Sequence, residues 1–455
     1  MRIVSFIIFL IPGIILGQDA ISLDQAQQFA LDNNRTLQAS HLNIAKAKEI
    51  VKETYAIGLP QINASAEYNN FLDIPVSVLP DFISPTVYGV LIQEDLIDAA
   101  QFPSDPNFVE ASFGTSNTLN AGATLSQLLF DGSYLVGLQA TKVYLGISEI
   151  QAEISEKDIK KNVAESYYNV LIAQENVKIL DESKTTIEKT ITEVRAMFNE
   201  GLMAEDDVDQ LQLTLIGIEN NLNNAKRQID LTKQLLKMQL GMELTAPLEL
   251  SDNLEALLNA KILASNETTF SIGKLPEFKL LENNIRANQL TVKNSKAKYL
   301  PSLSGFFSYS QSGQRNEFNF FDSNESWFAT TLWGMKLSVP VFSSGMKHAK
   351  VNQAKLDLES AILSKKDEEQ GLTIAAQKSK SDFDFANENH RAQKLSYELS
   401  GKIRNKTLIK YKEGLASSFQ LNQIETQYLE AQGAYLMSIL TLLNSKAAFD
   451  RAYGN

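Results

Sequence analysis

The sequence lacks cysteine altogether and has only three histidines among its 455 residues. Without cysteine there is no disulfide framework, no thiolate nucleophile and no zinc site built on thiolates. The histidines, His41, His348 and His390, lie far apart and in no spacing typical of a metal site, so we interpret each as a helical surface residue. No nucleotide-binding motif is found either, so any work driven by nucleotide hydrolysis would need a partner.

An excess of basic residues is also missing. The formal net charge is −12, which argues against nucleic acid or anionic lipid as a main partner. The hydrophobic fraction of 44% is ordinary, so the chain can bury a core.

Long apolar runs are absent beyond the N-terminus. None approaches the roughly 18 residues that a membrane-spanning helix needs, so the chain could enter a membrane only as a closed β-barrel. At the N-terminus, Arg2 precedes an apolar run over 3–16, which predicts a secretory signal peptide at 1–17. An uncleaved anchor is the alternative. Gln18 stands where a lipoprotein would have cysteine, so no lipid can be attached.

Proline is missing from 107–246 and from 341–455, which permits very long helices there. Apolar residues in both spans recur in steps of three and four, the heptad pattern of helices packed as coiled coils. The first seam contains Val208, Leu211, Leu215, Ile218, Leu222, Ala225, Ile229 and Leu236, and the second contains Leu421, Ile424, Tyr428, Ala431, Tyr435 and Leu442.

The two seams lie 213 positions apart, as Val208 and Leu421 illustrate, and this offset indicates an internal duplication. It also relates two Glu-Gly-Leu motifs, at Gly201 and Gly414. A glycine between two heptad runs suits the point where a helix stops and reverses, so we predict the tips of two helical hairpins. A capping box at 22–25 starts another helix, expected to run to about Gly58.

Leu-Pro pairs at Pro60 and Pro301 mark the places where helical patterns change into alternating ones. Proline has no N–H to donate and disfavours helix in the residue before it, so it suits a change from helix to strand. Alternation of apolar with polar residues predicts two strands in each half of the chain. The expected strands are 61–71, 117–130, 302–311 and 327–341.

Strands of this length can cross a bilayer at a tilt, and one apolar face opposite a polar one is typical of a transmembrane barrel. Four strands cannot close a barrel, whereas three copies would supply twelve and leave an open lumen. Trp327 and Trp333 suit anchoring at the membrane interface. A soluble sandwich edge, or a hairpin lying on the helices, is the alternative for any single strand.

These features resemble the TolC-like outer-membrane efflux protein family over essentially the whole mature chain. The matching segments are the opening SLDQAQQFALDNNRTL, the two Leu-Pro pivots, QLLFDGS, VPVFSSG and the two hairpin tips. Arg35 departs from the family, which usually has proline there, and the first strand loop at 72–116 is much longer than its counterpart at 312–326.

The resemblance implies a mainly α-helical fold with a transmembrane β-barrel, formed by a homotrimer in the outer membrane and continued by a helical tunnel across the periplasm. It implies an exit duct for solutes, joined to an inner-membrane pump or exporter through a periplasmic adaptor, with no catalytic residues and no cofactor. The domain prediction is a signal peptide at 1–17, one repeat at 18–246, a linker at 247–275 and a second repeat at 276–455.

Family members close the tunnel at the hairpin tips through hydrogen bonds and salt bridges. The family's gate tyrosine matches Tyr411, and its carboxylate partner matches Asp207. Ala416 replaces the family's arginine, while Gln420 and Gln423 replace its acidic ring. Acidic residues gather instead at the first tip, where they suit either the helix dipole or a cation-selecting ring. These residues are Glu205, Asp206, Asp207 and Asp209.

Two other classes of function are open on the residues alone. A periplasmic coiled-coil scaffold or adaptor without a pore explains the heptads, the acidity and the signal peptide, but not the paired alternating strands. An enzyme is the weaker candidate, because the acidic pair Asp206-Asp207 lies at a rod tip with no nearby histidine or glycine-rich loop.

Overall fold

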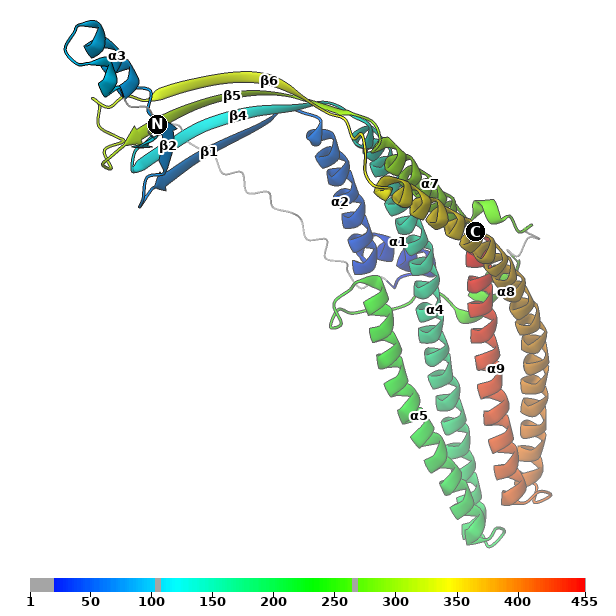
Figure 1. Ribbon diagram of the computed structural model, residues 1–455. Coiled ribbons are helices and arrows are strands. Elements are labelled where there is room, and N and C mark those ends of the chain that lie inside the picture. Colours follow the sequence, from blue (N-terminus) through cyan, green and yellow to red (C-terminus); the bar gives the residue numbers. More distant parts are fainter. Residues whose placement is uncertain (1–19, 103–107, 264–268, 455) are drawn as a thin grey trace, which may run out of the picture. The chain divides into compact units, whose positions relative to one another are not determined.

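The computed structural model describes residues 20–102, 108–263 and 269–454 (Figure 1), so the predicted signal peptide at 1–17 lies outside the described residues. The chain forms two compact units. Of the described residues, one unit contains 20–49, 142–263, 269–289 and 355–454, and the other contains 50–102, 108–141 and 290–354. Each unit takes segments from both predicted repeats, because each repeat passes from helix to sheet and back.

Long helices dominate the chain, as predicted. The helices are α1 (Leu23–Asn33), α2 (Arg35–Ile57), α3 (Ser84–Gln93), α4 (Gly132–Asn199), α5 (Glu205–Leu240), α6 (Leu254–Leu263), α7 (Pro276–Ala297), α8 (Met346–Lys412) and α9 (Ser418–Tyr453), with short 3₁₀ turns η1 (Ala99–Gln101) and η2 (Ile272–Lys274). In Figure 1, α4 and α5 form one hairpin and α8 and α9 form another. Among the described residues, none of the helices has the length and apolarity to cross a membrane.

The first helix is shorter than predicted. The capping box of Ser22 and Gln25 is present, but the helix ends at Asn33 instead of continuing to Gly58. Asn34 interrupts it with an extended ψ of 126°. Its side-chain oxygen accepts a hydrogen bond from the N–H of Thr36 at 2.9 Å, and its amide donates to the Gln239 carbonyl at 2.6 Å. The asparagine therefore starts α2 as a separate helix.

The predicted heptad seam of α5 is its buried side. Val208, Leu211, Ile218 and Leu222 are all at most 6% exposed. Together with residues of the other long helices, the first three form one apolar cluster that joins the two hairpins. Its buried members are Ile187, Ile191, Val194, Val208, Leu211, Ile218, Tyr411 and Leu421.

The second unit is built on a four-stranded antiparallel sheet with the strand order β1-β4-β5-β6. A separate two-stranded ribbon pairs β2 with β3. The strands are β1 (Gln61–Asn70), β2 (Val76–Pro80), β3 (Phe108–Ser112), β4 (Asn117–Asp131), β5 (Ser302–Arg315) and β6 (Phe328–Ser338).

Both Leu-Pro pivots separate a helix from a strand. Helix α2 ends at Ile57 and β1 begins directly after Pro60, while α7 ends at Ala297 and β5 begins directly after Pro301. The prediction that the last strand continues to Val341 is wrong. Strand β6 ends at Ser338, because Pro340 has no N–H with which to continue the ladder.

Candidate functional site

The sheet carries a continuous apolar row on one face. Ile62, Leu125, Phe307 and Trp333 lie opposite one another on the four successive strands. Their exposed fractions are 73%, 36%, 46% and 73%. Large apolar side chains so exposed on every strand mark a surface that is covered by something other than water.

The other face of the sheet is polar. The neighbouring row contains Asn63, Thr124 and Ser308, and the hydroxyls of Thr124 and Ser308 are 3.0 Å apart. Two apolar residues interrupt this face, Phe306 on β5 and Leu332 on β6, which lies opposite Ser308. The Phe306 ring lies over Gly334 on β6, where a Cβ would come within 2.8 Å of it. The glycine thus leaves room for the aromatic ring.

The sheet has two open edges. In the described strand order, β1 pairs only with β4 and β6 pairs only with β5. Each edge strand therefore presents unpaired backbone N–H and C=O groups, which can pair with another chain.

The two tryptophans occupy different positions. Trp327 directly precedes β6 and contacts Phe320, with ring centroids 6.2 Å apart. It belongs to a group of aromatic rings at the end of the sheet where the 316–327 loop lies, which suits the predicted interface role. Trp333 lies instead in the middle of β6, within the apolar row. This position suits contact with lipid chains more than anchoring at an interface.

Both hairpin tips have the same glycine-based turn. Gly201 has φ of 79° and Gly414 has φ of 74°, the left-handed conformation that only glycine adopts freely. In the second tip, the N–H of Gly414 donates to the Tyr411 carbonyl at 3.0 Å and the N–H of Leu415 donates to the Lys410 carbonyl at 2.8 Å. The first tip repeats this pattern, as the 213-residue offset predicts.

Tyr411 lies in the apolar cluster between the hairpins and is 1% exposed. Among the described residues, its hydroxyl has no hydrogen-bond partner. Burial raises the pKa of this phenol to about 12, and the negative charge of Asp207 also raises it. The Asp207 carboxylate itself accepts a hydrogen bond from the N–H of Ala204 at 3.3 Å, at the start of α5. The charge of Asp207 therefore acts on Tyr411 without a hydrogen bond between the two side chains.

The other tip acids, Glu205, Asp206 and Asp209, are exposed at the start of α5. Within the described ranges, no group of three or more His, Asp or Glu side chains is placed to hold a metal ion. A second contact joins the hairpins nearby, where Lys412 of α8 lies 2.5 Å from Glu193 of α4. Sequence reasoning missed this pair, because nothing in either residue's surroundings indicates the other.

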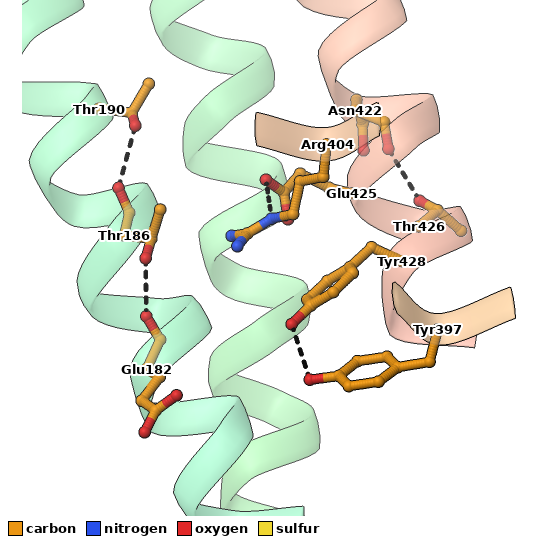
Figure 2. Close-up of polar contacts among 9 residues, drawn as sticks. All are labelled: Glu182, Thr186, Thr190, Tyr397, Arg404, Asn422, Glu425, Thr426 and Tyr428. Carbon is orange, nitrogen blue, oxygen red and sulfur yellow. Dashed lines mark hydrogen bonds and ion pairs between the residues drawn. The ribbon is translucent and has the colours of Figure 1, made fainter. Parts of the chain in front are cut away.

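A buried ion pair lies inside the second hairpin, and the sequence analysis missed it as well. Arg404 of α8 and Glu425 of α9 point toward each other in Figure 2. Burial raises the pKa of Glu425, while the Arg404 charge acts in the opposite direction. The guanidinium lies 4.7 Å from the centre of the Tyr428 ring, whose hydroxyl is 3.1 Å from that of Tyr397.

Tyr428 and Tyr397 belong to a stack of rings that continues through Tyr435 to His390. The prediction that His390 is a surface residue is therefore wrong. His390 is only 7% exposed and its ring stacks on Tyr435, whereas His41 and His348 are exposed as expected. The Nδ1 atom of His390 lies 3.2 Å from the Ser438 hydroxyl. The sequence gives no sign of this burial, because a single histidine in a helix is usually a surface residue.

Comparison with known proteins identifies the family. The model of the outer membrane efflux protein family matches residues 108–242 and 274–455. The chain belongs to this family. This match confirms the TolC-like resemblance of the sequence. It also confirms the predicted location, in the outer membrane with long helices in the periplasm. The family is one of transport proteins and not of enzymes.

Among curated proteins, the chain is similar to outer membrane protein TolC of Vibrio cholerae, with 25% identity over 55% of this chain and 58% of the relative. It is also similar to outer membrane protein TolC of Salmonella enteritidis, with 24% identity over 58% of this chain and 54% of the relative. These matches thus span less than two thirds of the relatives' length.

Solved structures share the fold along almost the whole chain. A structure of CusC matches with a TM-score of 0.70 and 15% identity, covering 97% of this chain and 95% of that one. The CmeC outer membrane channel of Campylobacter jejuni matches with a TM-score of 0.68 and 18% identity, covering 95% of this chain and 85% of that one. At such low identity, the likeness establishes the fold alone.

Proposed function

We propose that this outer membrane efflux protein is the exit duct of a tripartite efflux or type I secretion system. Three copies associate, each contributing its four strands to one twelve-stranded barrel. The duct conducts solutes passively to the exterior, because the sequence has no nucleotide-binding motif. An inner-membrane pump supplies the energy, and a periplasmic adaptor joins the pump to the duct.

One observation carries the proposal: the sheet has an exposed apolar row on one face, a polar face behind it and an open edge on each side. In a closed barrel, the row from Ile62 to Trp333 faces lipid and the row of Asn63, Thr124 and Ser308 faces the lumen. Closure also pairs the free edges of β1 and β6 between copies, which removes unsatisfied backbone groups from the membrane.

The hairpin tips form the periplasmic gate in this proposal. Tyr411 packs the second hairpin onto the first, with Asp207 beside it. Opening requires these two hairpins to separate at their tips. Glu205, Asp206 and Asp209 then surround the entrance with negative charge from three copies, which favours entry of cations.

The test is single-channel current from the purified trimer in a planar lipid bilayer. Stable steps with a preference for cations are expected. Because the chain has no native cysteine, cysteines placed at Ala64 on β1 and scanned over Ala329, Thr331 and Trp333 on β6 report the pairing of edges directly. Disulfide-linked trimers are expected at one register. A protein that neither inserts nor cross-links would be a periplasmic scaffold instead.

A further inference from the structure

The connection from β1 to β4 has secondary structure of its own in its described residues, 71–102 and 108–116. It contains the β2–β3 ribbon and helix α3, whereas the corresponding connection between β5 and β6 is a short loop at 316–327. The opposite ends of these strands lead into the helices. Because the long helices are periplasmic, the segment lies on the outer side of the membrane.

Helix α3 is apolar on two sides, and only one of these sides packs against other residues of the chain. Tyr88 and Leu91 are half-buried, and the Tyr88 ring packs edge-on against Phe102 with centroids 6.2 Å apart. A second stripe at helical spacing faces away. Ile83, Val87 and Val90 are 61%, 49% and 53% exposed. Among its described residues, α3 has none that is fully buried.

The ribbon of the same segment also carries exposed apolar residues. Val76 and Val78 lie on one face of β2, and Phe108 is on the same face of β3, opposite Pro80. Val76, Val78 and Phe108 are 55%, 61% and 65% exposed. We call Val76, Val78, Ile83, Val87, Val90 and Phe108 the loop surface. Exposed apolar side chains concentrated in one short segment are typical of an interaction site.

All charged residues of the segment that carries the loop surface are acidic. Residues 71–116 contain seven Asp and Glu residues and no Lys, Arg or His, and no basic residue occurs anywhere from 53 to 141. Glu94, Asp95 and Asp98 follow directly after α3 and are exposed. Glu110 lies beside the apolar residues of the ribbon, paired with Val78. The apolar surface therefore has an acidic rim.

The negative charge of this rim favours one kind of binding partner over the others. A second copy of the same segment would bring acidic groups against acidic groups, with no cation to compensate them. An anionic lipid surface is disfavoured for the same reason. A protein surface with an apolar centre and surrounding Lys or Arg side chains matches both features of the loop surface.

We propose that the loop surface docks a second protein, one that presents an apolar patch bordered by Lys and Arg. The inference depends on the exposed residues of this segment and does not require the channel to conduct. An inactive pore would therefore leave it intact, and loss of docking would leave the proposed transport function intact.

The experiment is photo-cross-linking in living cells that make the full-length protein. The photoreactive residue p-benzoylphenylalanine replaces Val87, and in a second variant Val90, both exposed positions. The matched control places it at Phe321, which is 82% exposed in the other loop at the same end of the sheet. We expect Val87 and Val90, but not Phe321, to cross-link to a different protein, with Lys or Arg flanking the linked peptide.

The charge requirement is tested in the same cells. Glu94→Gln, Asp95→Asn and Asp98→Asn together should lower the yield of the cross-link about eightfold, since losing each rim pair weakens binding roughly twofold. A cross-link to another copy of this chain would overturn the proposal, as would a cross-link to lipid. So would the absence of any cross-link, or a yield that the three substitutions leave unchanged.

Discussion

The Nε atom of Arg404 lies 2.8 Å and 2.9 Å from the two carboxylate oxygens of Glu425, inside the second hairpin. The side chain of Glu425 is only 1% exposed and that of Arg404 only 10%. At the equivalent places of the first hairpin, 213 residues earlier, stand Ile191 and Gln212. The two repeats therefore differ at this place, where the second has an ion pair and the first has Gln212 and Ile191, a member of the apolar cluster.

Breaking the Arg404–Glu425 pair should be costly. We expect Arg404→Ile to destabilise the protein by about 3–5 kcal/mol, because it leaves the Glu425 carboxylate buried without a partner. Adding Glu425→Leu should restore most of the loss, since apolar residues can replace both members of a buried pair. The measurement is the denaturation midpoint of helical circular dichroism. A double variant as unstable as the single one would show that the pair has a role beyond mutual neutralisation.

The gate prediction concerns Tyr411 and Asp207. Tyr411→Phe with Asp207→Ala should raise single-channel conductance in planar bilayers, because it weakens the tip where the hairpins meet. Tyr411→Phe alone should change stability by no more than about 1 kcal/mol, since the lost hydroxyl has no hydrogen-bond partner in the described part of the chain. Unchanged conductance in the double variant would remove both residues from the gate.

Asp209 distinguishes between the two roles considered for the acidic tip, stabilising the helix dipole and selecting cations. Glu205, Asp206 and Asp207 lie in the first turn of α5, where each can stabilise the helix dipole by roughly 0.3–1 kcal/mol. Asp209 lies beyond that turn, so the dipole does not account for it. We expect Asp209→Asn to reduce the preference of the channel for cations, measured as a shift in reversal potential in a salt gradient. The alternative result is that Asp209→Asn has no effect, while Glu205→Gln and Asp206→Asn lower stability without changing the ion preference. The acidic residues would then stabilise the helix dipole and not select cations.

Some parts of the structure follow from the sequence because they depend on local chemistry. Proline positions fix both helix-to-strand changes, and glycine fixes both tips. The buried side of α9, in contrast, differs from the side that the heptad pattern predicts. The heptads place Ile424 and Ala431 at the seam, yet the fully buried neighbours are Glu425 and Gln432, each 1% exposed.

The reason is that burial on α9 depends on which face meets α8 and the first hairpin. A charged residue beside a seam ordinarily remains in solvent, and only Arg404 on α8 makes the burial of Glu425 tolerable. The partner lies across the hairpin tip, where no spacing rule connects the two. Likewise, the 71–116 segment has no repeat counterpart from which its fold could be inferred.

The two faces of β6 make a direct test of membrane insertion. Met335 lies on the apolar face and is 67% exposed, and the next residue, Lys336, lies on the polar face. We expect Met335→Lys to oppose insertion by roughly 2–4 kcal/mol, the cost of a basic residue in contact with lipid. Lys336→Met should insert normally. Refolding into lipid vesicles, followed by gel mobility before and after heating, measures both. Equal insertion of the two variants would contradict the assignment of faces.

A pH dependence should arise from His390. Burial lowers the pKa of this imidazole below its ordinary value near 6.5, and the charge of Lys394 lowers it further. The folded protein therefore binds this proton less tightly than the unfolded chain, so stability is complete above about pH 6.5 and is lost as the pH falls through the lowered pKa. His390→Phe keeps a ring to stack on Tyr435 but cannot titrate.

Melting temperatures at pH 7.5 and 5.5 test this dependence. The wild-type protein should lose stability on acidification, and His390→Phe should lose less of it. Exposed His41 provides the control, because His41→Gln should leave the wild-type difference unchanged. The reverse result, with His41→Gln reducing the difference and His390→Phe retaining it, would assign the titration to a different group. A smaller loss of melting temperature in His390→Phe than in the wild-type protein would show that the stack of rings in the second hairpin is sensitive to acid, because its histidine is held neutral.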